Sequence, residues 1–72
     1  MTIENVKAFV EECVKNLEFC NYVYEIETLR DKAFGVCDFA VRFCDADLET
    51  MHKIYKIWQN ASDKFDWAIY KI

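Results

Sequence analysis

The residues of this chain that are best suited to chemistry are four cysteines and a single histidine. The cysteines form two pairs, each seven residues apart: Cys13 with Cys20, and Cys37 with Cys44. Zinc sites usually bring two ligands together with about two to four residues between them. Seven residues span roughly 10 Å along a helix and over ~20 Å along a strand, so neither pair can chelate a metal within one element. We expect no metal and no cofactor; a site shared between elements is the remaining alternative.

Catalysis by a cysteine needs a base within hydrogen-bond reach and a lowered thiol pKa. Cys44, just before an expected helix, is the candidate, and His52 follows on the expected outer side of that helix. A solvent-exposed surface histidine is the simpler interpretation of His52. The single glycine, Gly35, cannot build a phosphate-binding loop. The sequence therefore predicts that the protein is not an enzyme.

Composition predicts one compact domain over residues 1–72. The chain is 54% apolar and 17% aromatic, which is enough to fold, although 72 residues lie near the lower limit for an unaided core. It contains no run of about 20 apolar residues and no signal-peptide pattern, so no membrane association is expected. The protein is therefore expected to be cytoplasmic. In that reducing compartment its four cysteines are expected to be free thiols.

The spacing of apolar residues predicts an order of helix, strand, strand, helix, strand. Positions 3–17 repeat every three or four residues after an N-cap at Thr2, and Asn21 is the expected terminator. From Tyr22 the alternation is by two, with a turn at Asp31 and Lys32. This register pairs Tyr24 with Phe39 and Ile26 with Cys37 on one face. On the other face it pairs Glu25 with Asp38 and Glu27 with Val36.

A second helix is expected after a cap at Asp45 or Asp47, ending near Asn60 to Ser62. Its expected buried stripe consists of Leu48, Met51, Ile54, Tyr55, Trp58 and Ala61. Residues 64–72 alternate and are expected to form a third strand. The predicted fold class is therefore α+β: a three-stranded antiparallel sheet in the order 2-1-3, with both helices on one face. Trp58 and Tyr24 are expected in the core between helices and sheet.

The other face of that sheet has no cover within the chain, and it is the predicted binding site. Three carboxylates, Glu25, Glu27 and Asp38, would form an acidic patch on it. A directly opposed pair, Glu25 and Asp38, would cost stability, which suggests that a partner relieves the repulsion. The expected border of the patch consists of Phe34, Val36 and Tyr70.

The charge distribution indicates what kind of partner this patch would bind. The net charge is −4; residues 1–49 carry 11 acidic and 5 basic side chains. We therefore expect a protein-interaction module whose partner has a basic surface. Small acidic chains without catalytic motifs are typical of phage or mobile-element inhibitors of host proteins, such as defence-system nucleases. The alternatives are a homodimer that completes its core, and a single-stranded nucleic-acid-binding domain that the carboxylates make less favourable.

Overall fold

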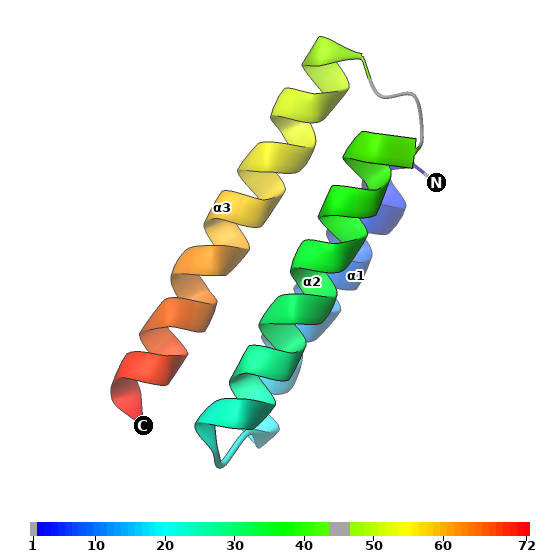
Figure 1. The fold of residues 1–72 in the computed structure, drawn as a ribbon. Coiled ribbons are helices and arrows are strands. Elements are labelled where there is room, and N and C mark those ends of the chain that lie inside the picture. The colour runs from blue at the N-terminus through cyan, green and yellow to red at the C-terminus, as the bar shows by residue number, and fades with distance from the viewer. Residues whose placement is uncertain (1, 44–46) are drawn as a thin grey trace.

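The computed structural model describes residues 2–43 and 47–72, and these form an antiparallel bundle of three helices (Figure 1). Helix α1 spans Ile3–Lys15 and continues into a short 3-10 helix, η1, at Asn16–Phe19. Helix α2 spans Val23–Phe43, and α3 spans Leu48–Lys71. Each long helix contacts the other two. The bundle is elongated, with Cα extents of 38 × 16 × 16 Å.

The predicted α+β fold with a 2-1-3 sheet is wrong, because the described residues contain helices and no strand. Both expected hairpin strands lie within α2, and the expected third strand is the end of α3. The buried positions of α2 are Ile26, Ala33, Cys37 and Ala40, spaced by seven, four and three residues. That is helical spacing, but three of these four side chains are small. The aromatic residues that suggested strands lie mostly on the exposed side of this helix.

The start of α1 confirms the predicted N-cap. The Thr2 hydroxyl accepts a hydrogen bond from the Asn5 amide at 3.1 Å, and its backbone is extended, as this position requires. The helix buries Val6, Val10 and Cys13 against its neighbours. The helix ends at Lys15, two residues before the end of the predicted apolar stripe at Leu17. The chain continues there as the tighter 3-10 helix η1.

The start of α2 is fixed by the carboxylate of Glu25, a residue that was predicted to lie in a sheet. Glu25 Oε1 accepts hydrogen bonds from the backbone amides of Asn21 and Tyr22, both at 3.1 Å. These amides have no carbonyl partner at a helix start, so the carboxylate acts as one half of a capping box. The predicted turn at Asp31 and Lys32 is wrong, because both residues lie inside α2.

Helix α3 begins where predicted but runs further. The Asp47 carboxylate accepts a hydrogen bond from the Thr50 amide at 2.7 Å, which confirms the predicted cap; the alternative cap, Asp45, lies outside the described residues. The predicted stop near residues 60–62 and the strand over 64–72 are wrong. Ala61 and Phe65 are both buried and continue the stripe begun by Ile54 at helical spacing.

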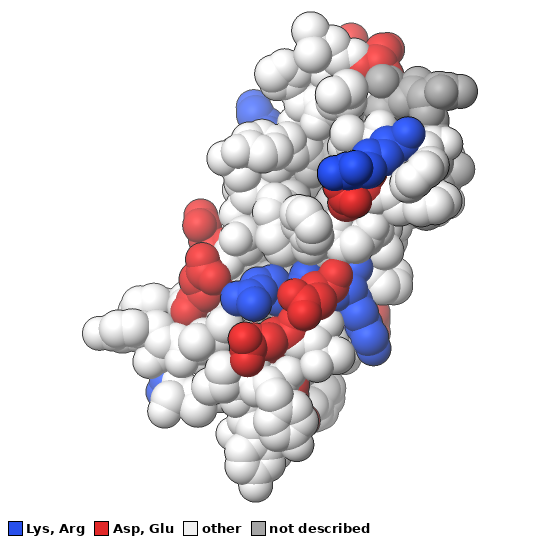
Figure 2. All heavy atoms as spheres, viewed as in Figure 1, with Lys and Arg blue, Asp and Glu red and all other residues white. Residues whose placement is uncertain are grey.

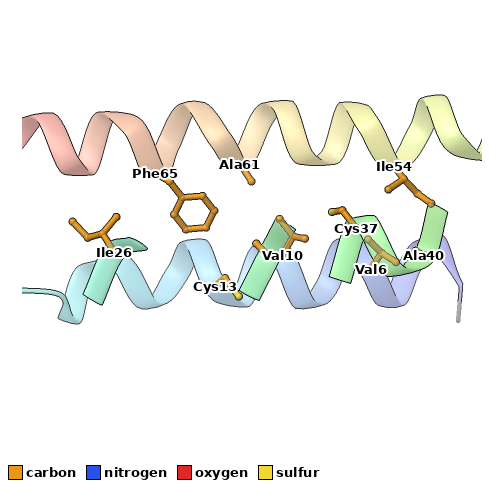
Figure 3. Close-up of a cluster of buried hydrophobic side chains, with 10 residues drawn as sticks. Val6, Val10, Cys13, Ile26, Cys37, Ala40, Ile54, Ala61 and Phe65 are labelled. Carbon is orange, nitrogen blue, oxygen red and sulfur yellow. The ribbon is translucent and has the colours of Figure 1, made fainter. Parts of the chain in front are cut away.

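In the part of the chain that the structure describes, the core lies along the bundle axis and consists of ten buried residues, nine of which are labelled in Figure 3. Phe65 is its largest fully buried side chain. Trp58 is half-buried and packs against this core, as predicted, although no sheet is there to meet it. The matching prediction for Tyr24 is wrong, because its side chain is 66% exposed. None of the described helices is long and apolar enough to cross a membrane.

Candidate binding groove

An apolar groove runs between α2 and α3, toward the end of the bundle where α2 finishes and α3 begins. Its volume is about 400 Å³. The lining side chains come from the second half of α2 and the first three turns of α3, and they are mostly apolar or aromatic: Phe34, Cys37, Asp38, Val41, Leu48, Met51, His52, Ile54, Tyr55 and Trp58. From Leu48 to Trp58 the lining extends over roughly 15 Å of helix.

The groove exists because α2 presents small side chains to α3 at this end. Cys37 and Ala40 are the buried α2 residues here, opposite Ile54 of α3 (Figure 3). Small residues leave the space between two helix ridges unfilled. Further along, the Phe34 and Trp58 rings meet edge to face with centroids 5.2 Å apart. That aromatic contact closes one end of the groove.

The rim of the groove carries large apolar side chains that face solvent. Leu48 is 70% exposed, Tyr55 59% and Phe34 50%. Figure 2 shows this side of the bundle: uncharged atoms cover most of the surface between the upper halves of α2 and α3, and charged side chains gather across the middle. Contiguous exposed apolar surface of this kind is typical of sites that bind another protein or a ligand.

Two polar side chains of the groove, Asp38 and Cys37, are constrained by their surroundings. Asp38 Oδ1 accepts a hydrogen bond from Arg42 Nε at 2.8 Å, one turn further along α2. Burial raises the pKa of the Cys37 thiol to about 11, with a smaller contribution from Cys13. At neutral pH only about one molecule in 10,000 would carry the thiolate that a nucleophile requires.

The structure separates the six residues of the predicted acidic patch. Phe34 and Asp38 line the groove. Val36 is half-buried and packs against the core. Tyr70 is 80% exposed near the end of α3, where its ring stacks on Trp67 at 5.6 Å.

The three carboxylates of that patch have separate local partners along α2. Glu25 caps the helix. The Glu27 carboxylate oxygen Oε2 lies 3.7 Å from Arg30 Nη2, and Asp38 forms an ion pair with Arg42. Glu25 and Asp38 are thirteen residues apart on one helix, which corresponds to roughly 20 Å along its axis. The predicted opposition of these two residues, and the sheet face that held the patch, are therefore wrong.

The α3 side of the groove was not predicted as a site from the sequence. Leu48, Met51 and Tyr55 were assigned to a buried stripe because they recur at helical spacing with Trp58. Ile54 and Ala61 of that predicted stripe are indeed buried, together with Phe65, whereas Leu48, Met51 and Tyr55 lie to one side of them and are exposed. The available signal was the width of the predicted apolar stripe, which is broader than a helix that contacts one core needs.

Cys13, Cys20 and Cys37 are free thiols, and burial is the main factor that raises the pKa of each; Cys44, the predicted candidate nucleophile, lies outside the described residues. Over residues 2–43 and 47–72, no three His, Cys, Asp or Glu side chains gather closely enough to hold a metal ion. Comparison with protein-family models, curated proteins and solved structures finds no match to this chain.

Proposed function

We propose that this chain is a non-enzymatic protein-interaction module and that the α2–α3 groove is its binding surface. The observation that carries the proposal is the exposed apolar rim formed by Phe34, Leu48 and Tyr55 around a groove of about 400 Å³. A groove between two antiparallel helices suits a helix of another polypeptide, whose apolar stripe packs between the two ridges.

Two narrower expectations from the sequence remain predictions. A partner with a basic surface is still favoured by the net charge of −4, and a phage or mobile-element inhibitor would use such a surface. The three carboxylates that were expected to bind such a partner do not lie together on one surface. The net charge is therefore the only support for a basic partner. The nucleic-acid alternative would need aromatic side chains side by side for bases to stack on, but Phe34 lies in the groove and Tyr70 near the end of α3.

Site-specific photo-crosslinking tests the proposal in cells that produce the chain. A photoreactive phenylalanine analogue replaces Tyr55 at the groove rim, or Tyr24 as a matched control that is equally exposed but belongs to the first turn of α2. We expect position 55 to crosslink to a polypeptide and position 24 to give much less product. The added change Leu48→Glu should suppress the crosslink from position 55. Equal crosslinking from both positions, or none from position 55, would contradict the proposal.

A further inference from the structure

The core of this bundle is small for the amount of apolar surface that the chain carries. Five of the ten buried residues are alanine or cysteine. Meanwhile, fourteen large apolar or aromatic side chains in the described part of the chain are at least about a third exposed. Domains of this size commonly gain the missing stability by association. A second copy of the chain is one partner that is available wherever the chain is made, and it would add to the stability of a core that the monomer already forms.

We propose that the α2–α3 groove is occupied by the same groove of a second copy, so that the α2–α3 pairs of two chains form a four-helix core. This inference rests on the proposed function, since it names the partner of that binding surface. In a two-fold arrangement the same patch serves on both sides. The rim side chains Leu48, Tyr55 and Phe34 of one chain then pack into the groove of the other.

The exposed area is sufficient for a modest dimer. Phe34, Leu48, Met51 and Tyr55 each expose on the order of 100 Å², as expected for large side chains at their exposure. With the remaining lining residues, each copy would contribute roughly 500 Å², so the pair would bury about 1,000 Å², the lower limit for a specific interface. We therefore expect dissociation in the micromolar range rather than an obligate dimer.

Charge distinguishes a second copy from a basic partner. Two copies each carry a net charge of −4, so their long-range interaction is repulsive, while the groove itself is apolar. Added salt screens the repulsion and strengthens apolar contact, which tightens self-association. Salt would instead weaken binding to a partner of opposite charge. The sign of the salt dependence therefore reports which partner occupies the groove.

Sedimentation equilibrium of the full chain tests this inference from about 1 µM to about 500 µM, at low and high salt. We expect the average mass of the parent protein to rise from that of one chain toward that of two, and the dissociation constant to fall severalfold in high salt. Tyr55→Glu, at an exposed position, should remain a monomer throughout while keeping its helical circular dichroism. Tyr24→Glu is the matched control and should dimerise like the parent.

Three results would overturn the inference: a parent protein that stays monomeric to the highest concentration, a dimer that weakens in high salt, or a Tyr24→Glu change that acts as strongly as Tyr55→Glu. Failure here is distinct from failure of the proposed function. A monomeric protein that crosslinks from position 55 to a different polypeptide keeps the groove as a binding surface and excludes the second copy. A monomeric protein without that crosslink contradicts both.

Discussion

The two ends of the α2–α3 contact are built from different side chains. Where α2 begins, Ile26 and Phe65 are fully buried and the bundle is filled (Figure 3). Where α2 finishes, Cys37 and Ala40 face Ile54, and a groove remains between the helices. The same two helices therefore form a closed core at one end and an open surface at the other. The size of the inward side chains, rather than their hydrophobicity, makes the difference.

The largest expected effect comes from opening the closed end. Phe65→Ala removes the largest fully buried side chain and should lower the free energy of unfolding by about 3–5 kcal/mol, much of what a domain this small possesses. Urea unfolding followed by circular dichroism measures it. Tyr70→Ala is the matched control on the same helix and should change stability by no more than about 0.5 kcal/mol. Similar losses for both changes would show that the filled end does not dominate stability.

Alkaline pH should lower the stability of the protein through Cys37, which lines the groove. The Cys37 pKa is raised from 9.0 to about 11, so the thiol is neutral in both states below pH 9 and ionises first in the unfolded chain above it. Stability is therefore complete below about pH 9 and declines as the pH rises toward about 11, by a loss on the order of 2 kcal/mol. Unfolding of the parent and of Cys37→Ala across this window measures the effect. The variant starts less stable but should show a shallower decline; equal slopes would contradict the assignment.

A substitution on the solvent-facing side of α2, away from both ends of the α2–α3 contact, should raise the stability of the protein. A Cβ added at Gly35 would meet nothing within 4 Å, and the residue lies in the middle of a helix. Gly35→Ala should therefore stabilise the protein by about 0.5–1 kcal/mol, because glycine loses more backbone freedom on folding. Thermal and urea unfolding measure the gain. Because the change touches neither end of the α2–α3 contact, a loss of stability would indicate that residue 35 packs against something.

The smallest expected effect concerns the rim of the open end. Asp38→Asn removes the charge that pairs with Arg42 across one helical turn, at an exposed position. It should lower stability by about 0.2–0.5 kcal/mol, and high salt should reduce the difference between variant and parent. Arg42→Gln is the matched variant, and the double variant should lose no more than either single change. Additive losses would show that the two side chains act independently.

The sequence allowed correct prediction of where α1 and α3 start, but not of α2 or of the fold. Thr2 and Asp47 were identified as caps because a short oxygen-bearing side chain before an apolar stripe has one main structural use. Helix α2 was mistaken for a hairpin because Val, Tyr, Ile, Thr and Phe favour strands and because the residues from Tyr22 onward alternate by two. The packing of Ala33, Cys37 and Ala40 against two neighbouring helices overrides those local preferences. No local pattern reports that packing.

The candidate site shows the same limit. Phe34 and Asp38 were identified, but for a sheet face that does not exist. The groove depends on how far apart α2 and α3 lie, and that distance follows from tertiary packing of small residues. Leu48, Met51 and Tyr55 were placed in one buried stripe with Ile54 and Ala61, and only the packing of Ile54, Ala61 and Phe65 into the core shows that the other three side chains are exposed.

An odd number of antiparallel helices places residues 3 and 71 at opposite ends of a bundle 38 Å long (Figure 1). A stretching force applied at those two points would run parallel to the helix axes. It would slide α1 and α3 past one another instead of peeling them apart one turn at a time. Contacts of Val6, Val10, Ile54 and Phe65 would then share the load together. The bundle should consequently resist tension applied along its axis better than tension applied across it.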